Sequence, residues 1–119
     1  MKSLSLVLKI TERCNLNCSY CYYFNGLDQS YKDKPAVMSK NTLAKVIDFL
    51  LQGIKELEVD SLSIILHGGE PLLIPKLYFD YICEQLISNF SFLSKLRISI
   101  QSNGVLIDKD WIAIFKNMM

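Results

Sequence analysis

The feature that most constrains the fold is one pattern that occurs three times. A short stretch of alternating apolar and polar residues precedes a longer stretch with apolar residues at helical spacing. The alternating stretches cover residues 4–10, 61–67 and 96–101. Alternation with a period of two predicts β-strands, and the longer apolar stripes predict amphipathic helices. Strands that alternate with helices predict βαβ units around a parallel sheet.

Each predicted helix has a recognisable start. Ser39 is the expected N-cap of the first helix, Ile74-Pro75 begins the second, and Asp108 caps the third. Cys83 lies on the second apolar stripe, and a buried cysteine is commonly a small hydrophobe, so we assign it to the core. The expected stripes are Leu43, Val46, Ile47, Leu50, Leu51, Ile54 and Leu57; Tyr78, Phe79, Ile82, Cys83, Leu86, Ile87 and Phe90; and Trp111, Ile112, Phe115 and Met118.

The predicted strands each have one apolar and one polar face. Strands of a parallel sheet that is covered on both faces are apolar throughout, and these are not. A curved sheet with helices outside and a polar lumen inside explains the pattern, although a strand at a solvent-exposed edge would alternate in the same way. The polar positions are Ser5 and Lys9; Ser61, Ser63 and His67; and Arg97, Ser99 and Gln101.

Three of the four cysteines lie close together after the first predicted strand. Cys14, Cys18 and Cys21 have the spacing C-x3-C-x2-C, within a stretch from residue 11 to 35 that lacks periodicity. Long loops without secondary structure in compact domains tend to be functional. Iron–sulfur clusters are held by thiolates and normally take four ligands. Three cysteines on one loop therefore predict a cluster with one iron open to another ligand.

Zinc and disulfides are the alternatives for these cysteines. A structural zinc site uses a closed set of four ligands, usually in paired knuckles, and the other candidates, Cys83 and His67, are far along the chain. Three clustered cysteines leave an odd one in a disulfide scaffold, and the sequence shows no secretory context. We favour the cluster and keep a non-catalytic zinc-binding module as the alternative.

The cysteine loop, with Tyr20 directly before its last cysteine, resembles the signature of the radical SAM superfamily, whose members use S-adenosyl-L-methionine (SAM). The sequences C-Y-Y at 21–23, H-G-G-E-P at 67–71 and Q-S-N-G at 101–104 support this resemblance. Together the motifs resemble the branch with a C-terminal SPASM or twitch extension, which includes anaerobic sulfatase-maturating enzymes and peptide maturases. The resemblance implies an α/β fold that is the N-terminal part of a partial (β/α)6 TIM-like barrel, with a cluster-binding loop after the first strand.

The same resemblance implies the cofactors. Cys14, Cys18 and Cys21 would ligate a [4Fe–4S] cluster, and SAM would chelate the open iron. A one-electron donor of the flavodoxin or ferredoxin type would reduce the cluster, which cleaves SAM to a 5′-deoxyadenosyl radical. Tyr20 would pack near the adenine, or else shield the cluster from water. The resemblance assigns no catalytic acid or base, and we expect His67 to be a hydrogen-bonding residue of the lumen.

The other special sequences follow the second and third predicted strands. Parallel βα folds bind ligands at the carboxyl ends of their strands, so these sequences should meet the cysteine loop there. By resemblance Gly68 and Gly69 lie against the SAM amino group, with the Glu70 carboxylate or backbone carbonyls as acceptors. A tight turn that Pro71 stiffens is the structural alternative.

The Q-S-N-G sequence offers amide and hydroxyl groups. Gln101, Ser102 and Asn103 could hold the SAM carboxylate, its ribose or the substrate. Asn103-Gly104 is equally a common turn dipeptide. We favour contact with SAM or substrate.

Composition narrows the function classes. Half of the 119 residues are hydrophobic and the formal net charge is +1, which describes a soluble globular piece and favours neither nucleic acid nor membrane as a partner. The apolar start at 4–10 is too short to span a bilayer, and no signal peptide follows. Clustered cysteines without a secretory signal indicate the cytoplasm.

The length predicts an incomplete domain. A barrel of eight βα repeats takes about 250 residues, roughly 30 for each repeat, whereas only three repeats occur here. We expect residues 1–119 to be the N-terminal portion of a radical SAM core domain, with the rest of the barrel and the SPASM or twitch region absent. We expect such a fragment to lack turnover by itself.

The predicted function is post-translational modification of a ribosomal peptide or protein by radical SAM chemistry. The stretch 22–39 resembles maturases that crosslink side chains in ribosomally made peptides. Formylglycine formation, as in anaerobic sulfatase maturases, is the alternative within the class. A zinc-binding module and an inactive truncated product are the alternatives outside it.

Overall fold

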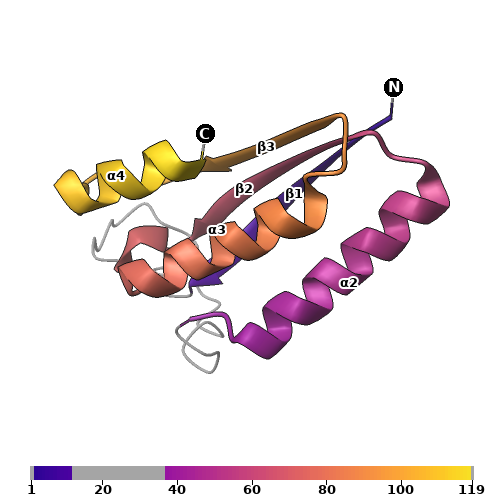
Figure 1. Ribbon diagram of the computed structural model, residues 1–119. Helices are drawn as coiled ribbons and strands as arrows, with labels where there is room; N and C mark the ends of the chain where they lie inside the picture. Colours follow the sequence, from indigo (N-terminus) through magenta and orange to yellow (C-terminus); the bar gives the residue numbers. More distant parts are fainter. Residues whose placement is uncertain (1, 12–36, 119) are drawn as a thin grey trace, which may run out of the picture.

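The computed structural model describes residues 2–11 and 37–118. The three predicted strands and three predicted helices are confirmed, with ends that differ by at most two residues, and a short 3-10 helix after the second strand was not predicted. Figure 1 shows the arrangement. The elements are β1 (Ser3–Thr11), α2 (Lys40–Leu57), β2 (Ser61–Gly68), η2 (Pro71–Leu73), α3 (Lys76–Phe90), β3 (Lys95–Ile100) and α4 (Lys109–Met118).

The described strands form one parallel sheet in the order β1-β2-β3, so β2 lies in the middle. Ser3 pairs with Ser61, which in turn pairs with Lys95, and the register continues toward the carboxyl ends of the strands. Because each connection passes through a helix and all strands run the same way, the three carboxyl ends lie at one edge. This arrangement confirms the α/β fold and is that of a segment of TIM-like barrel wall.

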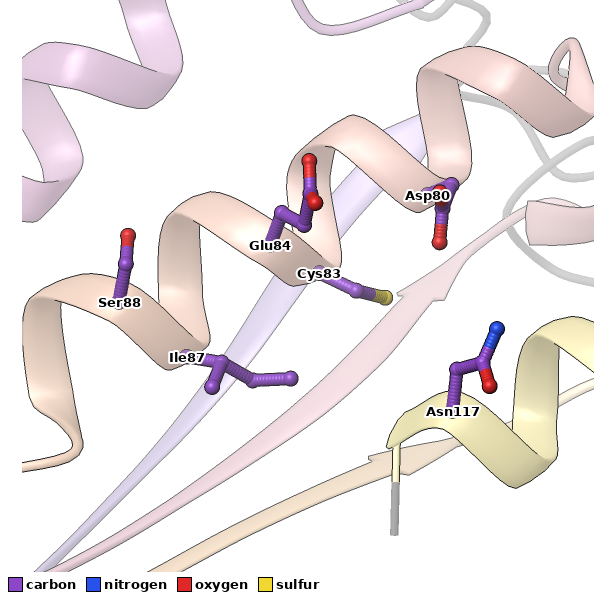
Figure 2. Close-up of a pocket in the computed structure, with 6 residues that line it drawn as sticks. All are labelled: Asp80, Cys83, Glu84, Ile87, Ser88 and Asn117. Carbon is purple, nitrogen blue, oxygen red and sulfur yellow. The ribbon is translucent and has the colours of Figure 1, made fainter.

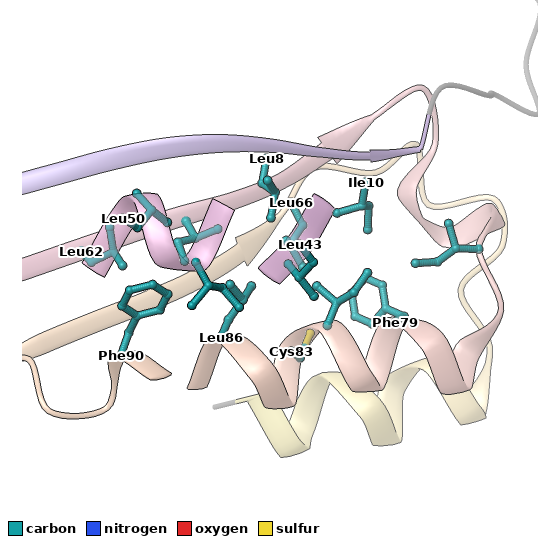
Figure 3. Close-up of a cluster of buried hydrophobic side chains, with 14 of the residues drawn as sticks. Leu8, Ile10, Leu43, Leu50, Leu62, Leu66, Phe79, Cys83, Leu86 and Phe90 are labelled. Atoms are coloured by element: carbon teal, nitrogen blue, oxygen red, sulfur yellow. The ribbon is translucent and has the colours of Figure 1, made fainter. Parts of the chain in front are cut away.

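Helices α2 and α3 cover the same face of the sheet, while α4 lies alongside α3 (Figure 1). Their apolar stripes meet the apolar faces of the strands in one core, and Figure 3 shows its central side chains. Phe79 is fully buried and makes an edge-to-face contact with Trp111, with ring centroids 5.0 Å apart. The buried strand residues of this core are Leu8, Ile10, Leu62, Ile64 and Leu66.

Two residues of the predicted stripes are exposed large hydrophobics. Leu57 is exposed because it is the last residue of α2, beyond the buried Ile54. Ile112 is also exposed, since the inner face of α4 is set by Trp111 and by residues three and four positions later. Helical periodicity thus predicted the helices but not the limits of their buried faces.

The opposite face of the sheet carries the predicted polar side chains, together with the apolar Val7 and Ile65. On β1, Ser5 and Lys9 are exposed, whereas Ser61, Ser63 and His67 on the central strand are half-buried. Neighbouring strands shield the middle strand on both sides, which explains the lower exposure of its side chains. No helix in the described part is long and apolar enough to cross a membrane.

The predicted caps of two helices are confirmed. The Ser39 hydroxyl accepts a hydrogen bond of 3.1 Å from the backbone N–H of Thr42. Asp108 accepts one of 2.9 Å from the N–H of Trp111, and its other oxygen accepts a 2.8 Å bond from the Lys76 ammonium at the start of α3. The Asp108 pair therefore joins the N-terminal ends of α3 and α4.

Candidate functional site at the carboxyl edge of the sheet

The strand ends that precede the three special sequences lie together at one edge of the sheet, as the sequence predicted. We call this region the rim and define it as Thr11, residues 68–70 and residues 101–103. The N–H of Gly69 donates to the Thr11 carbonyl at 3.2 Å, and the N–H of Gln101 donates to the Leu66 carbonyl at 2.9 Å. The ends of β1, β2 and β3 are thereby joined by backbone hydrogen bonds.

The predicted cluster ligands Cys14, Cys18 and Cys21, and the predicted adenine neighbour Tyr20, lie outside the described residues. The structure does show where their loop departs, because Thr11 ends β1 at the rim. The strand end from which the cysteine-bearing segment continues therefore lies beside the Gly-Gly sequence.

Gly68 is required by the protein's own backbone. Its φ of 143° lies in a region that side chains disfavour, and a Cβ at this position would lie 2.3 Å from the Thr11 carbonyl oxygen. The contact occurs where the register between β1 and β2 shifts, after Lys9. The close approach expected of this glycine is therefore made by strand β1, and contact between SAM and Gly68 or Gly69 stays a prediction.

Glu70 is the charged residue of the rim, and its side chain has no exposed surface. One carboxylate oxygen accepts hydrogen bonds from the Leu72 N–H at 3.3 Å and from the Ser102 hydroxyl at 2.7 Å. The other oxygen accepts from the Asn103 N–H at 3.0 Å. The carboxylate thus caps η2 and joins the ends of β2 and β3.

Sequence reasoning missed this arrangement, although part of the signal was present. Glu70 directly precedes Pro71, and an acidic residue before a proline at the first helical position is a recognisable helix start. The bonds to Ser102 and Asn103 span more than 30 residues of sequence, so no local pattern predicts them.

The Q-S-N-G sequence forms a turn with internal hydrogen bonds. The Ser102 hydroxyl accepts from the Gly104 N–H, and the Asn103 side-chain oxygen accepts from the Val105 N–H, both at 3.0 Å. Gly104 has a φ of 80°. The turn that we kept as the structural alternative is therefore present, whereas contact of Gln101, Ser102 or Asn103 with SAM stays a prediction.

The structure describes both of the other candidate metal ligands, His67 and Cys83. His67 lies on the polar face beside the rim, and its Nδ1 is buried without a hydrogen-bond partner among the described residues. Cys83 is core, as predicted, and burial, with a smaller contribution from Asp80, raises the pKa of its thiol to about 12. Metals bind the thiolate, so Cys83 is a poor ligand at neutral pH.

The described part holds no group of three or more His, Cys, Asp or Glu side chains that could bind a metal ion. A groove of about 430 Å³ lies between α3 and α4 (Figure 2), and it is lined by Asp80, Cys83, Glu84, Ile87, Ser88 and Asn117. This groove is on the helical side of the sheet, apart from the rim residues.

Most of this sequence is similar to that of known proteins. The model of the radical SAM superfamily matches residues 8–119. A cysteine-type anaerobic sulfatase-maturating enzyme of Clostridium perfringens is 33% identical in an alignment of 114 residues that covers 93% of this chain and 29% of that enzyme. A GTP 3′,8-cyclase of Paenarthrobacter nicotinovorans is 34% identical over 104 residues, 87% of this chain and 26% of that enzyme.

A solved structure has the same fold. It is described as native anSMEcpe with bound AdoMet and Cp18Cys peptide, and it superposes with a TM-score of 0.67 at 30% identity. The match covers 93% of this chain and 27% of that one. The chain thus spans less than a third of the length of these relatives. Because the family model matches nearly the whole sequence, the chain belongs to the radical SAM superfamily.

Proposed function

We propose that this chain carries the cluster-binding and SAM-binding part of an enzyme that modifies a peptide or protein by radical chemistry. The observation that carries the proposal is the convergence, in a member of this family, of the start of the cysteine loop, the Gly-Gly-Glu sequence and the Ser-Asn turn at one rim. Parallel βα folds bind their ligands at this edge. Membership of the family makes SAM and an iron–sulfur cluster the cofactors.

The donor groups of the chain fit these cofactors. Cys14, Cys18 and Cys21 would hold a [4Fe–4S] cluster and leave one iron for SAM, since such clusters take four ligands. When bound, the cluster supplies the electron that cleaves SAM to methionine and a 5′-deoxyadenosyl radical. The chain's own contribution is to bind SAM in one orientation and to exclude water.

The rim offers both hydrogen-bond acceptors and hydrogen-bond donors to SAM. Its ammonium needs acceptors, which the Gly68–Glu70 segment provides as backbone carbonyls. Its carboxylate and ribose need donors, which the exposed Gln101 amide and the segment Ser102–Asn103 provide. Tyr20 would pack beside the adenine. The apolar core behind the sheet holds these groups in place.

A peptide or protein is the substrate class that we propose. The sulfatase-maturating relative carries a protein substrate in its name, and the solved neighbour holds a peptide. The resemblance of 22–39 to peptide maturases favours crosslinking of side chains, whereas this relative favours formylglycine formation as the second candidate. The GTP cyclase relative, whose name gives a different substrate, supports the proposal that this N-terminal part binds the cofactor rather than selecting the substrate.

Residues 1–119 would then be the N-terminal portion of the radical SAM core domain of a cytoplasmic SPASM or twitch enzyme, reduced by a flavodoxin or ferredoxin. The chain spans 29% of the sulfatase-maturating relative, and three βα units would leave the lumen open on one side. We therefore expect the isolated chain to bind cofactors without turnover.

The test is anaerobic reconstitution with iron and sulfide, followed by EPR of the dithionite-reduced chain with and without SAM. We expect a [4Fe–4S]⁺ signal that changes when SAM is added. Cys14→Ala should abolish this signal, while Cys83→Ala, the matched control from the core, should keep it. A cluster whose signal is indifferent to SAM would contradict SAM binding, and tightly bound zinc without a cluster would support the zinc-binding module.

A further inference from the structure

We propose that Glu70 is a positioning residue whose carboxylate holds the end of β3 against the end of β2, and so sets where Ser102 and Asn103 meet SAM. The inference rests on the proposed function, because it concerns the same rim. It assigns Glu70 an indirect part in SAM binding, in place of direct contact between its carboxylate and the ligand.

The carboxylate is fully engaged inside the protein. Glu70 has no exposed surface, and its two oxygens accept three hydrogen bonds, from Leu72 on its own segment and from Ser102 and Asn103 on the neighbouring one. A buried carboxylate without partners is costly, so these donors have to stay in place around it. Among the described residues, both ion pairs are made by Lys76, with Asp108 and Asp110, so Glu70 depends on neutral donors.

The position of Glu70, just after β2, explains why a side chain is needed to join the ends of β2 and β3. The last backbone hydrogen bond between β2 and β3 at this edge is from the Gln101 N–H to the Leu66 carbonyl. Beyond it, hydrogen bonds from the Ser102 hydroxyl and the Asn103 N–H to the Glu70 carboxylate join residues 102–103 to the β2 segment. The Glu70 carboxylate therefore joins the β2 segment to the turn after β3, beyond the last backbone hydrogen bond between these strands.

The same short segment also contacts β1. The neighbouring Gly69 donates its N–H to the Thr11 carbonyl, while Glu70 accepts from the β3 side. Residues 69–70 thus join all three strand ends, and a shift of Glu70 would move the β3 turn relative to the strand that leads into the cysteine loop. Binding groups on separate segments need such alignment to act on one ligand.

Glu70→Gln is the sharpest substitution, since glutamine has nearly the same shape but only one acceptor atom. In one orientation of the amide its NH2 group faces the Leu72 N–H, and in the other it faces the Asn103 N–H. Either way, one backbone donor loses its acceptor. Ser102→Ala removes one of the bonds from the other side, and Glu84→Gln, exposed on α3, is the control.

Two measurements on the 119-residue chain test the proposal, each across these variants. Amide hydrogen exchange at Leu72 and Asn103, without SAM, reports the carboxylate contacts. The dissociation constant of SAM for the reconstituted chain, followed through the EPR change, reports the positioning. We expect Glu70→Gln to speed exchange at one or both amides and to weaken SAM binding about tenfold, while cluster content stays unchanged. Ser102→Ala should weaken it about threefold, and Glu84→Gln should change neither.

The double variant separates positioning from direct contact. If Glu70 acts through Ser102, the two substitutions together weaken SAM binding less than the product of their separate effects. Weaker SAM binding in Glu70→Gln with unchanged exchange, and independent effects in the double variant, would mean direct contact and overturn the proposal. Faster exchange with unchanged SAM affinity would also overturn it. A wild-type cluster that ignores SAM would instead refute the proposed function, and the exchange data would still report whether Glu70 holds the turn.

Discussion

The core between the sheet and its helices differs from the rim in how each keeps its shape. The core is held by many apolar contacts, with Phe79, Ile82 and Leu86 among its fully buried side chains. The rim is held by a few hydrogen bonds around one buried carboxylate and one close backbone contact. Apolar packing is distributed and has no preferred direction, whereas hydrogen bonds are few and directional.

This difference assigns separate tasks to the two regions. Loss of a core contact should lower the stability of the whole chain and leave the geometry of the rim intact in the molecules that remain folded. Loss of a rim contact should change local geometry with a smaller effect on overall stability. Substitutions in each region can test the division.

The largest effect on stability should come from Phe79→Ala. Phe79 is fully buried and packs against Trp111 and Phe115, so its removal leaves a cavity beneath the sheet. We expect the free energy of unfolding to fall by about 3–5 kcal/mol, measured by denaturant titration. Leu77→Ala, at an 87% exposed position two residues earlier, should change it little. Equal losses in the two variants would contradict the packing described for α3.

Gly68→Ala should have the next largest effect and should act at the boundary between the two regions. The added Cβ meets the Thr11 carbonyl, and the φ of 143° is strained for alanine. We expect a loss of about 2–3 kcal/mol in unfolding free energy, together with faster amide exchange at Gly69. Gly53→Ala is the control, because nothing lies within 4 Å of the added carbon in α2. There we expect a gain of roughly 0.5–1 kcal/mol.

The smallest effect should be a pH dependence at the exposed pair of Lys76 and Asp108. The hydrogen bond from Lys76, then that from the Trp111 N–H, lowers the pKa of Asp108 below its ordinary 3.8. A depressed carboxyl pKa stabilises the folded chain above that value, and the contribution is lost as the pH falls through the lower folded pKa. Asp108→Asn should therefore reduce the loss of stability between about pH 5 and pH 2, as followed by thermal unfolding. An unchanged acid profile would mean that other carboxyls dominate it.

Much of the fold followed from local patterns. Alternation predicted β1, β2 and β3 because one face of each strand is buried and the other is not. The caps at Ser39 and Asp108 were predictable because capping uses the side chain of one residue and a backbone N–H within three positions. The exposed positions of Leu57 and Ile112 were not, since burial depends on where the packing around α2 ends and on which face of α4 points inward.

Some features of the candidate site were likewise predictable from the sequence, and others were not. Residue types and spacing were enough to predict that the Cys14 loop, the Gly68-Gly69 pair and Ser102-Asn103 follow successive strands, because parallel βα units bring such sequences to one edge. The resemblance of these motifs to the radical SAM superfamily is confirmed by the family model, which matches residues 8–119. Spacing alone left open whether each side chain faces a ligand or the protein.

Tertiary structure decided that question for two residues. Gly68 meets the backbone of β1, and Glu70 faces the turn after β3, more than 30 residues away. Neither contact has a local signature, because each depends on the register between strands and on the depth at which a side chain is buried. The amino-acid sequence determined which chemical groups reach the rim, and the packing of the sheet determined which of them are already occupied by one another.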